Sequence, residues 1–312
     1  MLPSPILIIK LGALGNIILS LNAFAAIRAH HPDARISLLT TAPYAEWLRQ
    51  APWFDEVLID TRPRWWNLPG VRRLRAMLTQ PGFGRVYDLQ TSSRSSHYFR
   101  LFPRGAKPAW SGIAPGCSHP DRDPSRNRMH DNDRQAGQLR QAGIGLIPPA
   151  DLSWCRGDLG RFNLPPGIVV LVPGSAPHRP VKRWPALRYQ ALAKSLQAQG
   201  MTPVVVGSAG EAGLARAIPA AVDLTGQTSF GDLADLGRAA RFAVGNDTGP
   251  MHLLATAGCP ALVLFSHDSD PALCAPRGPD VRVLRRADLA SLEAGTVLAS
   301  LPWLPLPWKV MA

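Results

Sequence analysis

The sequence predicts an α/β protein of two domains, residues 1–162 and 163–312, each a parallel sheet covered by helices. Short runs of Val, Ile and Leu alternate with helical patterns in both halves. A proline-rich segment, 161–167, separates the two series. The 312 residues, 46% of them hydrophobic, can form the cores of about two domains. We expect the sheets to face each other across a cleft, with ligands at the carboxyl ends of the strands.

In the first half, four apolar runs are predicted to be strands: 6–10, 35–40, 56–60 and 85–90. The first is followed by a glycine loop, and the next helix is indicated by the spacing of Ile17, Leu21, Phe24 and Arg28. Residues 103–128 show no periodicity and are predicted to be a long loop. A helix is expected over 132–143.

The second half repeats this alternation. A strand and its loop are predicted at 168–175 and at 202–211, a strand, loop and helix at 241–258, and a further strand at 260–266. A helix over 184–200 has Pro185 near its first turn and Gly200 past its end. The last 12 residues or so are too proline-rich for a regular helix. We expect them either to pack on the first domain or to touch a membrane.

The charge balance favours anionic partners. With 34 Lys+Arg against 22 Asp+Glu, the net charge is +12, which suits phosphates, nucleotides, acidic glycolipids or nucleic acid. No stretch approaches the roughly 20 apolar residues of a membrane span, and the N-terminus lacks a signal-peptide pattern, so we expect a cytoplasmic protein. The four cysteines show no metal-ligand spacing and are expected to be buried free thiols.

A basic stretch, 61–78, interleaves five arginines with Trp65, Trp66 and several leucines: Arg62, Arg64, Arg72, Arg73 and Arg75. Such a stretch either binds an anionic membrane face or acidic acceptor, or is a solvated loop and helix. The sequence favours neither.

Two common nucleotide sites are disfavoured. The loop after the first strand offers only Gly12-x-x-Gly15, and no acid follows the second strand, as a nicotinamide-binding fingerprint requires. No G-x-x-x-x-G-K-[ST] phosphate loop is present either.

A diphosphate site is predicted instead in the second half. Asp247, Thr248, Gly249 and Pro250 lie between a strand and a helix, where glycine allows a close backbone approach and the first amides can bind an anion. Ser175, Lys182 and Arg183 follow another strand and supply cations, and Glu211 could accept ribose hydroxyls. Taken singly, each has a structural alternative: Asp247 closes a turn, Lys182 and Arg183 form a solvated loop, His252 is an ordinary helix histidine, and Glu211 is a helix N-terminal acid.

The chain resembles glycosyltransferase family 9, the heptosyltransferases of the lipopolysaccharide inner core. The resemblance rests on "LGALGNIILSLNAFAAIR", "YDLQTSSRS", "VPGS" followed by "KRWP", and "GNDTGPMHLLATAG", and it covers nearly the whole chain. It implies a GT-B fold of two Rossmann-like domains, with the acceptor held by the first and the nucleotide sugar by the second. It also implies sugar transfer with inversion from an ADP-heptose type donor, with no metal and no resident cofactor.

The resemblance also assigns residues. Lys182 corresponds to the diphosphate lysine, Glu211 to the ribose carboxylate and Asp247 to a sugar contact. The donor site implied in this way is Ser175, Lys182, Arg183, Glu211, Asp247, Thr248, Gly249, Pro250, Met251 and His252. The acceptor site is Gly15, Arg62, Arg64 and Arg94, and Asp88 lies in the segment lining the cleft.

Asn16 departs from the family pattern. The loop of the family usually reads L-G-D, and that aspartate is its proposed general base, whereas this chain has Asn16. An amide has no lone pair that takes a proton at neutral pH. We expect Asn16 to cap the following helix and to bind substrate, and Asp88, His97 or Asp247 are candidates to replace the base.

The predicted function is an inverting, monomeric heptosyltransferase-type enzyme, cytoplasmic or peripheral at the cytoplasmic face of the inner membrane, acting on an anionic glycolipid or glycan. A non-catalytic nucleotide-sugar or glycan-binding protein is the main alternative. Binding of nucleic acid is suggested by charge alone, has no supporting motif, and is not expected.

Overall fold

The computed structural model describes residues 3–176 and 178–303. The chain divides into two compact units, Met1–Trp154 and Cys155–Ala312. This division lies a few residues before the 162/163 boundary expected from the sequence. The expectation for the last 12 residues falls mostly on 304–312, outside the described residues.

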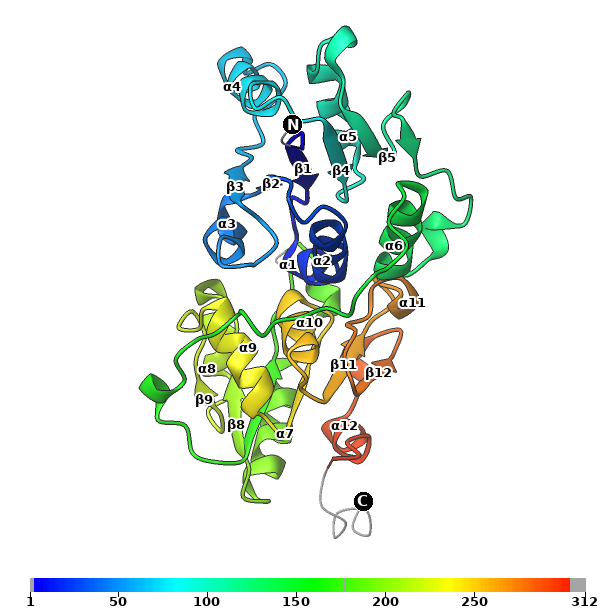
Figure 1. Cartoon of the computed structure of the whole chain (residues 1–312). Coiled ribbons are helices and arrows are strands. Elements are labelled where there is room, and N and C mark those ends of the chain that lie inside the picture. The colour runs from blue at the N-terminus through cyan, green and yellow to red at the C-terminus, as the bar shows by residue number, and fades with distance from the viewer. Residues whose placement is uncertain (1–2, 177, 304–312) are drawn as a thin grey trace. The chain divides into compact units, whose positions relative to one another are not determined.

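The first unit contains a six-stranded parallel sheet in the order β3-β2-β1-β4-β5-β6 (Figure 1). Its strands are β1 (Ile6–Ile9), β2 (Ile36–Thr40), β3 (Glu56–Ile59), β4 (Arg85–Asp88), β5 (Ala109–Gly112) and β6 (His119–Pro120). Its helices are α1 (Leu14–Ile18), α2 (Leu21–His30), α3 (Ala42–Leu48), α4 (Leu68–Thr79), α5 (Ser93–Tyr98) and α6 (Asp131–Gln141).

The second unit has a sheet of the same kind, in the order β12-β11-β10-β7-β8-β9. Its strands are β7 (Ile168–Val172), β8 (Thr202–Val205), β9 (Val222–Asp223), β10 (Phe242–Asn246), β11 (Ala261–Phe265) and β12 (Val281–Arg285). Its helices are α7 (Ala186–Gln197), α8 (Ala212–Arg216), α9 (Phe230–Ala239), α10 (Gly249–Thr256), α11 (Pro271–Cys274) and α12 (Ala294–Ala299). Numbered from its own first strand, each sheet follows the Rossmann order 3-2-1-4-5-6.

The predicted strands are confirmed because the central strands are buried on both faces. All four residues of β1 and all five of β10 are buried, which leaves a continuous apolar run in the sequence. The predicted helix 184–200 is also confirmed as α7, with Pro185 at its N-cap. The helix predicted from Ile17 to Arg28 is two helices, α1 and α2.

The loop predicted over 103–128 is wrong in part, because it contains β5 and β6. β5 has the sequence AWSG, in which Trp110 is completely buried. The hydroxyl of Ser118 accepts a hydrogen bond of 2.8 Å from the Trp110 amide. A four-residue strand with Ser and Gly among its members is too short and too polar to show a period.

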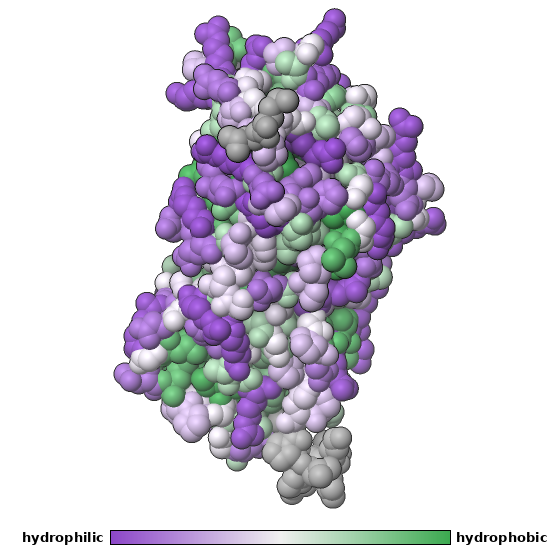
Figure 2. Space-filling model, in the orientation of Figure 1, coloured by the Kyte–Doolittle hydropathy of each residue, from purple (hydrophilic) through white to green (hydrophobic). Residues whose placement is uncertain are grey.

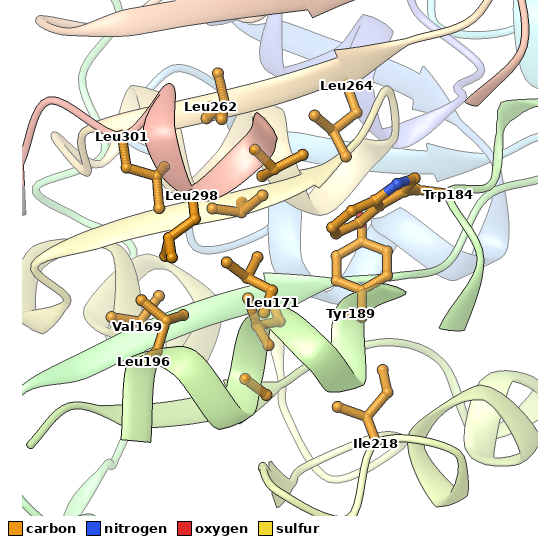
Figure 3. Close-up of a cluster of buried hydrophobic side chains, with 14 of the residues drawn as sticks. Val169, Leu171, Trp184, Tyr189, Leu196, Ile218, Leu262, Leu264, Leu298 and Leu301 are labelled. Carbon is orange, nitrogen blue, oxygen red and sulfur yellow. The ribbon is translucent and has the colours of Figure 1, made fainter. Parts of the chain in front are cut away.

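The core of the second unit lies between β7 and the helices α7 and α12 (Figure 3). Figure 3 shows side chains meeting that come from these elements or from residues next to them: Val169, Leu171, Trp184, Tyr189, Leu196, Leu298 and Leu301. Val170 and Val172 alternate with them along β7 and therefore lie on the other face of the sheet. The first unit has its own core, which includes Leu7, Ile9, Val86 and Trp110.

Hydrophilic residues cover most of the face drawn in Figure 2, with smaller hydrophobic areas between them. No helix in the described part of the chain is long and apolar enough to cross a membrane. The prediction of buried free thiols is confirmed for Cys117, Cys155 and Cys259, whereas Cys274 is half-buried.

Candidate donor and acceptor sites

The donor residues predicted in the second unit gather where β7 and β10 are neighbours. The strand order reverses at this point, so the loops after the two strands leave the same edge in opposite directions and form a ligand crevice. Asn246, the last residue of β10, ties these loops together. Its amide nitrogen donates to the carbonyls of Pro173 (2.8 Å) and Gly174 (3.2 Å), and its amide oxygen accepts from the Trp184 backbone N–H (3.0 Å).

Asn246 is a positioning residue that the sequence analysis did not single out. It is completely buried, and its amide oxygen also accepts a hydrogen bond of 3.1 Å from the hydroxyl of Tyr189. The signal for it in the sequence was a polar residue closing an otherwise apolar strand, directly before Asp247.

Lys182 and Asp247 form a buried ion pair. The Lys182 Nζ lies 2.5 Å from Asp247 Oδ2, and the two side chains are only 11% and 7% exposed. The Ser269 hydroxyl donates to the same carboxylate oxygen at 2.7 Å, and His252 Nε2 lies 3.9 Å from Asp247 Oδ1. The alternative in which Lys182 belongs to a solvated loop is therefore wrong, because the lysine is held by a carboxylate at the end of β10.

Arg183 and Ser175 form a second link between the loops. Arg183 Nε donates to the Ser175 hydroxyl at 3.0 Å, and its Nη2 donates to the Ser175 carbonyl at 3.3 Å. Ser175 is buried, and its hydroxyl donates to the carbonyl of Arg179 at 3.1 Å. Arg183 therefore stabilises the turn after β7, with its guanidinium half-buried.

The segment from Thr248 begins α10. Thr248 is the N-cap residue, with an extended backbone and no side-chain cap, and Pro250 stands in the first turn. The first N–H groups of a helix have no acceptor within it, so this end can bind an anion. Gly249 and Pro250 are half-buried there, whereas Met251 and His252 are buried. A Cβ on Gly245 would lie 2.6 Å from the Met251 sulfur, so Met251 packs against β10.

Glu211 is an acid in the first turn of a short helix, as the structural alternative to a ribose-binding role expected. Its Oε2 accepts from the Ser208 backbone N–H (2.7 Å) and hydroxyl (2.9 Å) in a capping box. The same side chain lies against the loop after β7, because a Cβ on Gly174 would fall 1.7 Å from Glu211 Oε1. Glu211 is thus held next to the loop that carries Ser175.

In the first unit, the glycine loop leads from β1 into α1. Gly12 has φ +125°, and a Cβ on it would meet the Tyr44 ring at 2.8 Å, so only glycine fits. Helix α1 starts at Leu14 with Ala13 as its N-cap, and Gly15 and Asn16 lie inside its first turn. The expectation that Asn16 caps this helix is therefore wrong. Asn16 is exposed, and its backbone carbonyl accepts a hydrogen bond of 2.7 Å from the Ser20 hydroxyl.

Asp88 ends β4 beside Ile9, the last residue of β1, and it is completely buried. Its Oδ1 accepts from the Thr91 N–H at 3.0 Å, while Oδ2 has no hydrogen-bond partner among the described residues. Burial raises the pKa of Asp88 to about 7. Burial also lowers the pKa of Lys10, whose ammonium lies 3.8 Å from Asp131. Asp88 thus has a proton affinity suited to a base, but its carboxylate is shielded from solvent.

The arginines predicted to bind the acceptor lie in segment 60–66 of the same unit or contact it. Arg62 is exposed, and its Nη2 donates to the carbonyl of Leu11 in the glycine loop at 3.1 Å. The Arg94 guanidinium donates to the Pro63 carbonyl at 3.3 Å and lies 5.4 Å from the Trp65 ring centre. Arg64 is exposed and lies over the Trp66 ring at 5.3 Å. A cavity of about 240 Å³ beside α5 is lined by Ser93, Ser96, His97, Arg100, Ile113 and Pro115.

The family model for glycosyltransferase family 9 (heptosyltransferase) matches residues 124–297, more than half of the chain. The chain therefore belongs to glycosyltransferase family 9. Two curated heptosyltransferases are similar to this family 9 chain over shorter segments. Lipopolysaccharide heptosyltransferase 2 of Escherichia coli K12 is 33% identical over 115 residues, 34% of this chain and 33% of its own length. Lipooligosaccharide heptosyltransferase 2 of Haemophilus influenzae is 31% identical over 127 residues, 38% and 36% of the two chains.

These alignments span about a third of each curated relative. Solved structures match the family 9 chain over nearly its whole length. E. coli ADP-heptose LPS heptosyltransferase II gives a TM-score of 0.75 at 22% identity, covering 94% of this chain and 96% of that one. The family 9 glycosyl transferase of Veillonella parvula gives 0.77 at 20% identity, covering 95% of each. E. coli heptosyltransferase WaaC with ADP gives 0.73 at 20% identity, covering 94% and 98%. These similarities confirm the predicted GT-B class of two Rossmann-like units.

Proposed function

We propose that the chain is an inverting glycosyltransferase that moves a heptose-like sugar from an ADP-heptose type donor to a lipopolysaccharide-core or related glycan acceptor. Family membership supports this, and solved relatives are described as complexes with ADP and with ADP-2-deoxy-2-fluoro heptose. The observation that carries the proposal is the buried Lys182–Asp247 pair directly before α10, at the switch point of the second sheet. A leaving diphosphate needs both a cation and oriented N–H groups, and this crevice supplies both.

In the proposed reaction, the donor site binds the diphosphate, the ribose and the sugar through separate groups. The first-turn amides of α10 bind the diphosphate, and Lys182 and Arg183 offset its charge, so that no resident metal or cofactor is required. Glu211, already fixed beside Gly174, accepts the ribose hydroxyls. Asp247 contacts the sugar and holds Lys182 in position until the donor arrives.

His97 fits the role of general base better than Asp88 does. Its Nδ1 lies 2.5 Å from the Ser93 carbonyl, which can only accept a hydrogen bond, so Nδ1 carries the ring proton. Nε2 of His97 then has a lone pair that can accept a proton. His97 is exposed and lines the cavity beside α5. With an amide at position 16, we propose that His97 takes the proton of the acceptor hydroxyl.

The acceptor is proposed to be anionic, bound by the exposed Arg62 and Arg64 together with Arg94. We also propose a monomer that works on the cytoplasmic face of the inner membrane. The large exposed apolar side chains of segment 65–68 support membrane contact, because Trp66 is 75% and Leu68 61% exposed among arginines. Trp and Arg side chains of this kind favour an anionic bilayer surface.

Asn16 favours one alternative, a nucleotide-sugar or glycan-binding protein without catalysis. The first test is thermal unfolding with ADP, UDP, GDP and CMP, since a ligand at 100 times its Kd adds about 2.7 kcal/mol. Stabilisation by ADP alone supports the donor site, and no stabilisation by any of the four contradicts it. ADP release from ADP-heptose, with and without a heptose-free core acceptor, then separates the enzyme from the binding protein.

A further inference from the structure

A second cavity, of about 330 Å³, lies at the amino ends of the central strands β1 and β4 of the first sheet. Its lining includes Ile6 and Arg85, the first residues of β1 and β4, which are register partners. Its other walls include Ser4, Gly84 and the histidines at the end of α2, His30 and His31. The proposed reaction uses the carboxyl ends of these strands, so this cavity has no part in it.

A chain of hydrogen bonds runs along one wall of the cavity. Arg85 Nη1 donates to the Tyr87 hydroxyl oxygen at 3.2 Å, and that oxygen lies 2.8 Å from His31 Nε2. A guanidinium can only donate, so the Tyr87 hydroxyl accepts from Arg85 and makes a second hydrogen bond with His31 Nε2. Nδ1 of His31 is not part of this chain of hydrogen bonds, and it donates to a ligand once the imidazole is protonated.

Positive charge in this wall is not neutralised locally. Among residues 3–176 and 178–303, no carboxylate forms an ion pair with Arg85. Burial, followed by the charges of His30, Arg85 and Arg28, lowers the pKa of His31 to about 4. Acids of the neighbouring segments are engaged or exposed: Arg28 binds Asp55 at 2.5 Å, Arg35 binds Glu56 at 3.2 Å, and Asp33 is exposed.

Several carbonyl groups next to the cavity are already used. Arg28 Nη1 donates to the carbonyls of Pro32 (3.3 Å) and Ala34 (2.9 Å), and the His31 N–H donates to the last carbonyls of α2. The Gly84 carbonyl accepts from the Ala109 N–H at 2.9 Å. The Ser4 hydroxyl lies over Gly84, where a Cβ would come within 3.0 Å of it. The guanidinium of Arg85, the Ser4 hydroxyl and the His31 ring can donate to a ligand.

We propose that this cavity binds a phosphate group, either inorganic phosphate or that of a small phosphomonoester. Arg85 supplies a fixed positive charge, and His31 and Ser4 supply donors. The cavity volume is near the lower end of ligand pockets, roughly 300–1,000 Å³, which suits a small molecule rather than a nucleotide. When a phosphate dianion binds, it offsets the cations around His31, and the imidazole can take up a proton.

The test follows the eight histidines by their imidazole NMR signals over a pH series. The 312-residue chain is titrated with inorganic phosphate, with sn-glycerol 3-phosphate, and with chloride or acetate at matched ionic strength. We expect either phosphate to raise the pKa of His31 by about 1 or more, as an opposite charge nearby does. A larger effect of the ester identifies a phosphorylated metabolite as the ligand class. An unchanged pKa of His31, an equal rise with acetate, or an equal rise at His119 of β6, which is in neither proposed substrate site, overturns the proposal.

Variants make the assignment specific. Arg85→Gln should abolish the phosphate-dependent rise, while Arg35→Gln, an exposed arginine paired with Glu56, should retain it. Because Arg85 also binds the Ala142 carbonyl, Arg85→Lys and His30→Gln serve as milder changes if Arg85→Gln does not fold. A full rise in Arg85→Gln or in both milder variants contradicts the site. Phosphate bound at the donor loops leaves His31 unaffected, so failure of this site and failure of the proposed function are distinguishable.

Discussion

The Lys182 ammonium lies 2.5 Å from the Asp247 carboxylate, with both groups withdrawn from solvent. The two residues come from different loops, and their contact links the segment after β7 to the end of β10. A lysine that binds the donor diphosphate has to share its charge between Asp247 and the phosphates. The Ser269 hydroxyl, which also donates to Asp247, stabilises the carboxylate during that exchange.

Removal of the lysine tests this relationship. Lys182→Ala leaves Asp247 buried without its cation, and breaking a buried pair in this way costs about 3 kcal/mol or more. We expect a lower free energy of unfolding in urea and loss of stabilisation by ADP. Lys194→Ala, an exposed lysine on α7, is the control and should change neither. Normal ADP stabilisation in Lys182→Ala would exclude the lysine from the donor site.

Asn16→Asp tests whether the missing base limits the rate. The side chain is exposed in the first turn of α1, where an acid is also favourable to the helix, so stability should not fall. If the base was simply lost, turnover should rise by about 100-fold or more in a heptosyl transfer assay. Asn127→Asp, at another exposed position, is the matched control. Unchanged or lower turnover would count against a simple loss.

His97→Gln tests the proposed replacement base. Gln retains size and polarity but cannot take a proton, so kcat should fall by about 100-fold or more while ADP stabilisation stays the same. The comparison is Ser93→Ala, which keeps the backbone carbonyl that orients His97. Undiminished kcat in His97→Gln would assign the proton transfer to another group.

Asp88→Asn tests the buried carboxyl of the first unit. Because burial raises its folded pKa to about 7, from about 3.9 when unfolded, the native state binds the proton more tightly between these values. Its stabilising contribution is therefore complete below pH 4 and is lost as the pH rises through 7. Relative to wild type, Asp88→Asn should gain about 3 kcal/mol between pH 5 and 8 in urea unfolding. A difference independent of pH would mean that Asp88 keeps its charge in the folded state.

Membrane contact can be tested by flotation with vesicles that contain phosphatidylglycerol. We expect binding that weakens with salt, because screening reduces the attraction of the arginines in 62–75. Trp66→Ser with Leu68→Ser should reduce binding, whereas Leu187→Ser, also highly exposed but in the second unit, should not. Equal binding to uncharged vesicles would contradict an electrostatic contact.

The central strands could be predicted because burial on both faces makes them continuous apolar runs. Strands at the edges gave weaker signals: β12 has exposed residues, and β9 is two residues long, so neither was predicted. The start of α1 was misjudged because the N-cap preference of Asn is a local tendency. The chain path through Gly12 places Asn16 inside the helix instead.

The sequence also predicted which loops carry the donor residues, because strand ends of a parallel sheet converge. It did not predict their pairing. Lys182 and Asp247 are 65 residues apart, and Asn246 acts through backbone groups of Pro173, Gly174 and Trp184. Contacts of this range depend on how β7 and β10 are placed side by side, which no local pattern encodes.

The two sheets share one strand order, so each unit has its own crevice at an equivalent place. The donor residues proposed here all belong to one crevice, and position 16 belongs to the other. A substitution at position 16 therefore leaves every residue of the proposed donor crevice unchanged. Each crevice can thus be altered by substitution without changing a residue of the other.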